Sequence, residues 1–128
     1  MGNGSSSIKY VSFEEVQRAI NSPITSVIIN TLPITDQQCL IVGSIVGLDE
    51  ETRINQLLAQ NKKVQIIVYG KNCADTNVIK KATQLYSLGF SNICVYGGGL
   101  FEWLLLQDVY GGTEFRTTNK NIDLLKYK

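Results

Sequence analysis

Short apolar runs alternate with amphipathic stretches along the 128 residues of this chain. Apolar runs rich in Val and Ile predict buried strands, and apolar residues three or four positions apart predict helices with one buried face. We expect strands at residues 9–11, 27–30, 39–45, 64–69 and 92–96, and helices at 13–21, 49–61, 76–88 and 100–110. This alternation predicts an α/β fold, with about five mainly parallel strands in one sheet and helices on both of its faces.

Several polar residues and glycines mark where these elements begin and end. Ser12 is expected to cap the first helix, with Glu15 completing a capping box. Asp75 is expected to cap the helix at residues 76–88, and Gly89 stands where a glycine ends a helix. The run at residues 64–69 is interrupted only by Gln65, so we expect it to be the central, buried strand.

Composition narrows the class of protein. Twelve basic and 11 acidic residues give a net charge of +1, and no basic run is present, so nucleic acid is not an expected partner. No apolar stretch approaches the roughly 18 residues of a membrane span, and the polar N-terminus does not resemble a secretory signal. A single folded, cytoplasmic domain is the expectation.

The reactive side chains are few. Histidine is absent, which excludes Ser-His-Asp and Cys-His catalysis within this chain and removes the commonest metal ligand. Cys39, Cys73 and Cys94 lack metal-binding spacing, so we expect neither a metal nor a cofactor. Cys39 and Cys94 lie in apolar runs and are expected in the core.

The loop after the run 64–69 is where we expect a functional site, because ligands of open α/β sheets bind beyond the carboxyl ends of the strands. Backbone N–H groups at the start of the next helix, together with Lys71, would favour an anion. An ordinary structural turn is an equally weighted alternative. The predicted anion-binding loop consists of Gly70, Lys71, Asn72, Cys73, Ala74 and Asp75.

Three segments of the chain resemble one known family. Residues 85–103 read Leu85-x3-Gly89-Phe90-x-Asn92-Ile93-x3-Gly97-Gly98-Gly99-x3-Trp103. This resembles the C-terminal signature of rhodanese-like domains, a Gly-Phe-x-Asn-Val strand followed by a Gly-Gly pair and a Trp. Ser12-x-Glu14-Glu15-Val16 resembles the family's first capped helix, and residues 40–45 are similar to its His-Ile-Pro-Gly-Ala-Ile segment. In this order they cover about residues 9–110, so the resemblance implies a single rhodanese-like domain.

The resemblance also implies a loss of the family's chemistry. Rhodanese-like domains transfer a sulfane sulfur, which a cysteine directly after the fourth strand carries as a persulfide. Gly70 stands at that position here. The family's Asp and Arg after the second strand correspond to Asn30 and Leu32, and its His in the third segment corresponds to Leu40. These differences indicate a retained scaffold without the usual sulfur chemistry.

Cys73 is the only thiol of the loop and the candidate for any remaining catalysis. A nearby Lys71 and a helix start favour a thiolate, whereas Asp75 opposes it. The related phosphatases need Cys-x5-Arg, and counting from Cys73 leads to Ile79, so that chemistry is not expected. We favour the interpretation in which Cys73 is an ordinary loop residue.

The N-terminal leader carries a lipidation pattern. Residues 1–6 fit M-G-x-x-x-[ST], with Gly2 as the acceptor of a myristoyl group after removal of Met1. A chance match is the alternative. One myristoyl chain gives only reversible membrane binding, and neither a neighbouring cysteine nor a basic cluster adds a second signal.

The sequence thus predicts a leader at residues 1–8, a rhodanese-like domain at 9–112 and a C-terminal tail at 113–128. We expect a non-catalytic binding or regulatory module, held reversibly at the cytosolic face of a membrane through Gly2, with an unidentified protein partner. One alternative is a sulfurtransferase or thiol-redox enzyme that uses Cys73. Another is a soluble oligomerisation domain.

Overall fold

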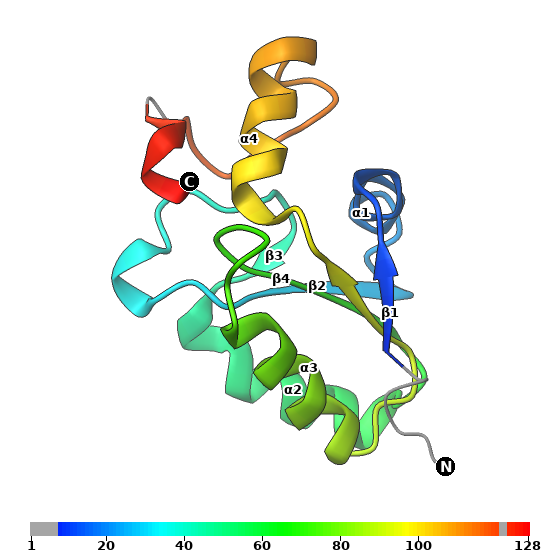
Figure 1. Cartoon of the computed structure of the whole chain (residues 1–128). Coiled ribbons are helices and arrows are strands. Elements are labelled where there is room, and N and C mark those ends of the chain that lie inside the picture. The colour runs from blue at the N-terminus through cyan, green and yellow to red at the C-terminus, as the bar shows by residue number, and fades with distance from the viewer. Residues whose placement is uncertain (1–7, 121–122) are drawn as a thin grey trace.

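The computed structural model describes residues 8–120 and 123–128, so the predictions for residues 1–7 lie outside the described residues. Five strands form one sheet in the order β1-β5-β4-β2-β3, and all neighbouring strands run parallel (Figure 1). They are β1 (Ile8–Val11), β2 (Ser26–Asn30), β3 (Ser44–Ile45), β4 (Gln65–Tyr69) and β5 (Ile93–Tyr96). The predicted α/β fold with a mainly parallel sheet is confirmed.

Strand β4 lies at the centre of the sheet, between β2 and β5. In its register, Ile67 stands beside Ile28 of β2 and Cys94 of β5. Ile66 and Val68 have no exposed surface, because both faces of the strand are covered. Full burial of each such side chain stabilises the fold by about 1.5–3 kcal/mol. The prediction that this run forms the central buried strand is confirmed.

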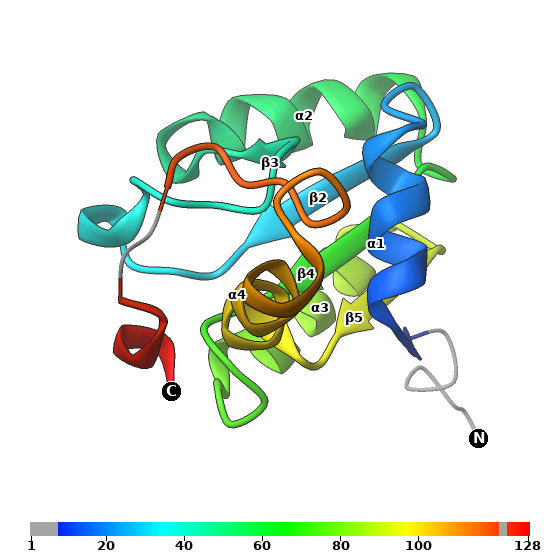
Figure 2. The ribbon, with the colours of Figure 1, turned by 90° about the horizontal axis from the view of Figure 1, so that it is seen from above.

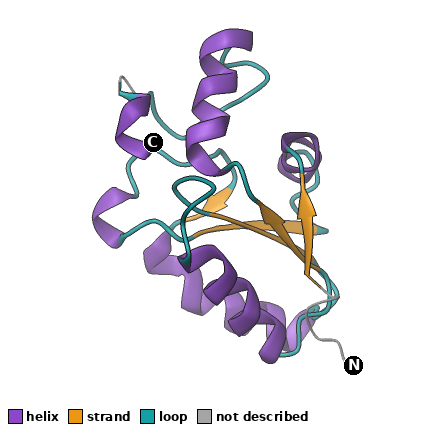
Figure 3. Cartoon of the chain, in the orientation of Figure 1, coloured by secondary structure: helices purple, strands orange, loops and turns teal. Residues whose placement is uncertain are grey.

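Four helices cover the two faces of the sheet in pairs, as Figures 2 and 3 show. Helices α1 (Phe13–Ile20) and α4 (Gly99–Tyr110) pack on one face, and α2 (Glu50–Gln60) and α3 (Asn77–Ser87) pack on the other. Alternate residues of β4 point to opposite faces. Ile67 therefore belongs to the same core cluster as Trp103 of α4, while Ile66 belongs to the cluster that contains Leu85 of α3. In the described part of the chain, none of the helices has the length and apolar character needed to span a membrane.

The predicted third strand is wrong over most of its length. Only Ser44 and Ile45 pair as a strand, with β2, out of the expected residues 39–45. Leu40 and Ile41 are buried, but they lie in an irregular segment that contacts Thr117 of the tail through one antiparallel bridge. An apolar run indicates that a segment is buried. Burial alone does not show whether the segment is a strand or a loop covered by other parts of the chain.

The predicted capping box at α1 is also wrong. The side chain of Ser12 makes no cap hydrogen bond, and only its backbone carbonyl accepts one, from the amide of Glu15 at 3.1 Å. The Glu15 carboxylate instead pairs with Arg18 one turn along the helix. The Glu15 side chain, which the capping box required, is thus engaged in an (i, i+3) ion pair within the helix.

Candidate functional site

Three loops converge at the carboxyl end of the central strands, and they follow β2, β4 and β5. The amide of Thr31, after β2, donates to the carbonyl of Tyr69 at the end of β4 (2.9 Å). The amide of Leu100, after β5, donates to the carbonyl of Gly70 (2.9 Å). The loop at residues 70–75 is therefore fixed on both sides by the backbone of its neighbours, at the edge where the sequence predicted a site.

The carboxylate of Asp75 is the centre of this loop. Its Oδ2 accepts hydrogen bonds from the amide of Lys71 (3.0 Å) and from the hydroxyl of Thr31 (3.2 Å). Its Oδ1 accepts one from the amide of Asn77 at the start of α3 (2.9 Å). Asp75 lies just before the N-cap residue Thr76, one position earlier than a regular N-cap. The carboxylate of Asp75 thus accepts hydrogen bonds from backbone amides that we expected to bind an external anion. Binding of an external anion stays a prediction.

Gly70 is tightly enclosed by side chains. A β-carbon at this position would lie 2.3 Å from Asp75 Oδ2, 2.6 Å from Val78 Cγ2 and 2.7 Å from Thr31 Oγ1. All three distances are well inside van der Waals contact, and Val78 is β-branched and held in a helix, so it has few alternative rotamers. The position that resembles the family's sulfur-carrying cysteine therefore has no space for a side chain in this arrangement.

Cys73 lies away from this centre. It is exposed to solvent, whereas Cys39 and Cys94 are buried as predicted. Asn72, beside it, accepts a hydrogen bond from the amide of Ala74 (2.9 Å) and donates one to the carbonyl of Tyr127 (2.8 Å). Among the side chains of the loop, those of Asn72 and Asp75 add to its backbone hydrogen bonds by connecting it to Tyr127 and Thr31.

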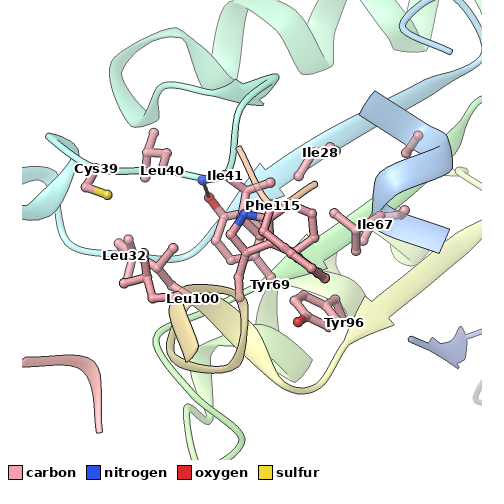
Figure 4. Close-up of a cluster of buried hydrophobic side chains, with 14 of the residues drawn as sticks. Ile28, Leu32, Cys39, Leu40, Ile41, Ile67, Tyr69, Tyr96, Leu100 and Phe115 are labelled. Atoms are coloured by element: carbon pink, nitrogen blue, oxygen red, sulfur yellow. Dashed lines mark hydrogen bonds between the residues drawn. The ribbon is translucent and has the colours of Figure 1, made fainter. Parts of the chain in front are cut away.

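The residues that correspond to the family's polar groups are structural here. The buried side chain of Asn30 forms an amide–amide pair with Gln37, with N···O distances of 2.9 and 3.1 Å. Gln37 also accepts a hydrogen bond from the amide of Gly47 (2.9 Å), so the pair ties β2 to two loops. Leu32 and Leu40 lie in the hydrophobic core (Figure 4). These four side chains are all uncharged.

Two buried tyrosines, Tyr69 and Tyr96, stand at the carboxyl ends of β4 and β5. The hydroxyl of Tyr69 accepts a hydrogen bond from the amide of Ile41 (3.1 Å), drawn in Figure 4, and lies 2.7 Å from the hydroxyl of Ser44. Burial raises the pKa of Tyr69 well above its ordinary value. Tyr96 donates to the carboxylate of Glu102 (2.6 Å), and burial followed by this negative partner raises the pKa of Tyr96 even further. Both hydroxyls are therefore neutral packing groups and not acids at neutral pH.

A cleft of about 710 Å³ borders the site between α2 and α3. Asn30 and Thr31 are among its lining residues, and an ion pair between Glu50 of α2 and Lys81 of α3 joins the two helices that line it. Among residues 8–120 and 123–128, no three His, Cys, Asp or Glu side chains are grouped in a way that would hold a metal ion.

Sequence reasoning located the loop but missed its long-range partners. Asp75 was expected to cap the following helix, and it also accepts a hydrogen bond from Thr31, 44 residues away. Gln37 and Tyr127 were not singled out. Neither stands in a recognisable motif, and only the fold brings them to this edge.

Comparison with protein-family models gives no match for this sequence, and comparison with curated proteins gives none either. Solved structures do resemble it. Ygr203w from Saccharomyces cerevisiae, described as a homolog of single-domain rhodanese and the Cdc25 phosphatase catalytic domain, has a TM-score of 0.63 and 17% identity over 97% of this chain and 96% of that chain. The Alr3790 protein from Anabaena sp. has a TM-score of 0.62 and 18% identity over 91% and 97%.

A thiosulfate sulfurtransferase from Pseudomonas aeruginosa has a TM-score of 0.61 and 21% identity. That match covers 96% of this chain but only 24% of the larger protein. Together with the all-parallel sheet, these likenesses show that the fold is rhodanese-like, as the sequence pattern predicted.

Proposed function

We propose that this chain is a non-catalytic rhodanese-like module that acts by binding, and that it does not transfer sulfur. The observation that carries the proposal is the packing around Gly70, where Asp75, Val78 and Thr31 take the space that a sulfur-carrying side chain would need. Catalysis of persulfide transfer depends on loop amides directed at the reacting sulfur, where charge develops. Here Asp75 already binds the amide of Lys71.

The hydrogen bonds of Asn30 and Gln37 support the same proposal. Asn30 and Gln37 use their polar atoms on each other and on backbone groups, so neither is available to orient a substrate. Lys71 is exposed at the rim of the loop. A module of this kind would hold a partner through the loops at the carboxyl end of the sheet, with Lys71 favouring a partner's carboxylate or a small anion.

A thiosulfate:cyanide sulfurtransferase assay tests the proposal. The wild-type chain is expected to turn over no faster than the buffer background, and Cys73→Ser is expected to change nothing. Gly70→Cys alone is also expected to restore little, because the new side chain would collide with the Asp75 carboxylate. Wild-type turnover well above background that Cys73→Ser abolishes would establish the competing function, a sulfurtransferase with Cys73 as nucleophile.

We further propose that Gly2 carries a myristoyl group that tethers the module reversibly to a membrane, which the M-G-x-x-x-[ST] pattern supports. Co-expression with an N-myristoyltransferase is expected to move part of the protein onto liposomes, with an association constant on the order of 10⁴ M⁻¹. Gly2→Ala is expected to return it to solution, while Gly4→Ala, the same change two residues on, leaves binding intact. Equal partitioning of all three proteins would rule the tether out.

A further inference from the structure

The C-terminal tail crosses the site in two parts of different character. Its first part belongs to the fold: Phe115 packs against Trp103 (ring centroids 5.1 Å apart), and residues 116–118 run antiparallel to residues 40–42. The amides of Val42 and Thr118 donate to the carbonyls of Arg116 (3.1 Å) and Leu40 (2.8 Å). This part packs against α4, where the indole N–H of Trp103 donates to the carbonyl of Arg116 (3.1 Å).

The second part, residues 123–128, contains the short helix η4 (Leu124–Tyr127), and two of its side chains, Tyr127 and the partly buried Leu124, pack against the core. Tyr127 is only 3% exposed and belongs to the core cluster, whereas Leu125 is 64% exposed. Lys126 and Lys128 are also exposed, and Leu124 is half-buried. A short segment that inserts one fully buried aromatic ring, with a half-buried leucine beside it, resembles a peptide that docks through an aromatic anchor.

The polar contacts of this segment reach two of the loops that make up the candidate site. The carbonyl of Tyr127 accepts the hydrogen bond from Asn72 in the loop after β4 (2.8 Å). The ammonium group of Lys126 lies 3.4 Å from Asp36 of η2 (Ile34–Asp36), in the loop after β2. Segment 123–128 therefore bridges the carboxyl ends of β2 and β4, where α/β sheets bind their ligands. Figure 1 shows η4 beside the start of α4 at this edge.

We propose that the loops after β2 and β4 form a surface for a short peptide with one aromatic residue preceded by a basic residue, and that segment 123–128 fills this surface within the chain. The aromatic ring enters the core cluster, the backbone carbonyl bonds Asn72, and the basic residue pairs with Asp36. A partner with the same Lys-Tyr chemistry binds when it displaces the segment. This rests on the proposed function, because it names the binding face of the non-catalytic module.

Amide hydrogen exchange of the full-length chain tests the proposal without any sulfur transfer. Asn72 holds the amide of Ala74, and Tyr127 in turn holds Asn72. Tyr127→Ala is expected to speed exchange at Ala74 by about ten-fold or more, since the loop loses its outer support. The matched control Leu125→Ala changes an exposed residue of the same turn and is expected to leave exchange unchanged. Equal exchange in all three proteins would overturn the proposal.

A peptide added in trans tests the surface itself. The synthetic peptide of residues 123–128 is expected to restore slow exchange at Ala74 in Tyr127→Ala, and the same peptide with Ala in place of its Tyr is expected to have no effect. Protection by both peptides, or by neither, would overturn the proposal.

A charge exchange keeps the test valid if Tyr127→Ala does not fold. Lys126→Asp places two carboxylates together and is expected to speed exchange at Ala74, and Asp36→Lys in the same chain is expected to slow it again. Failure of the second change to rescue the first would contradict the pairing on which the proposed surface depends. Either result leaves the absence of sulfurtransferase activity to be judged by its own assay.

Discussion

In the loop after β4, the Asp75 carboxylate occupies the space that a side chain at position 70 would need. We expect Gly70→Ala to lower the free energy of unfolding by about 1–3 kcal/mol, the usual cost of overpacking, because the added carbon meets Asp75, Val78 and Thr31. In an Asp75→Ala background the added cost is expected to be smaller, since the nearest of these contacts is gone. Urea denaturation measures both values.

Gly112→Ala is the matched control for this substitution. A β-carbon there would meet nothing within 4 Å, so we expect a change within about 0.5 kcal/mol. Equal effects at Gly70 and Gly112 would show that the loop adjusts without cost and that the position is open to a side chain.

The two buried tyrosines predict a loss of stability at high pH. Burial raises the pKa of Tyr69 and of Tyr96 above the ordinary value near 10, so the folded protein holds these protons more tightly than the unfolded chain. The stabilisation is complete below about pH 10 and declines as the pH rises beyond it, by about 1.4 kcal/mol per pH unit for each tyrosine. Denaturation series between about pH 8 and pH 11 would detect the slope. A profile that stays flat above pH 10 would contradict the assigned burial.

At the scale of elements, the amide pair between Asn30 and Gln37 holds β2 to the loop that follows it. Gln37→Ala is expected to cost about 1–3 kcal/mol, because the buried Asn30 would lose a donor and an acceptor together. Gln38→Ala is the control, since that exposed side chain bonds only the nearby carbonyl of Thr35, and we expect less than about 0.5 kcal/mol. Similar losses of unfolding free energy for both variants would argue against a structural role for the pair.

The elements that the sequence predicted well are those with strong local signals. Residues 64–69 form the central strand because a nearly unbroken Val and Ile run suits a strand covered on both faces. Gly89 ends α3 as expected, with φ +115°, a conformation that glycine adopts readily. Residues 39–45 were misjudged because Leu40 and Ile41 are buried without strand pairing to β2.

The sequence could predict where the candidate loop lies, but it could not predict the hydrogen bonds that its side chains make. Its location follows from a buried strand feeding a helix, which is local information. The bonds from Asp75 to Thr31 and from Asn72 to Tyr127 span 44 and 55 residues, and no spacing pattern in the sequence reports such contacts. The sequence analysis assigned residues 113–128 only as a tail, and the structure places Phe115 and Tyr127 of this tail in the core beside α4.

At the scale of the whole molecule, a rhodanese-like sheet supports a loop whose interior is filled by its own side chains. The helices and the first part of the tail cover the faces of the sheet, so the carboxyl edge is where the module would meet a partner. Asp75 and the Asn30–Gln37 pair connect this edge through hydrogen bonds, and Gly70 has no side chain that could carry sulfur. The proposed non-catalytic function therefore predicts that no cysteine of the chain becomes a persulfide.

Intact mass spectrometry tests this prediction directly, on a chain that is reduced, freed of reductant and then incubated with excess thiosulfate. Transfer of the sulfane sulfur to a thiolate would release sulfite and add the mass of one sulfur atom to the chain. We predict an unchanged mass for the wild type and for Cys73→Ser. A wild-type chain heavier by one sulfur, with the addition mapped to Cys73 and missing in Cys73→Ser, would contradict the account and identify the exposed loop thiol as the sulfur carrier.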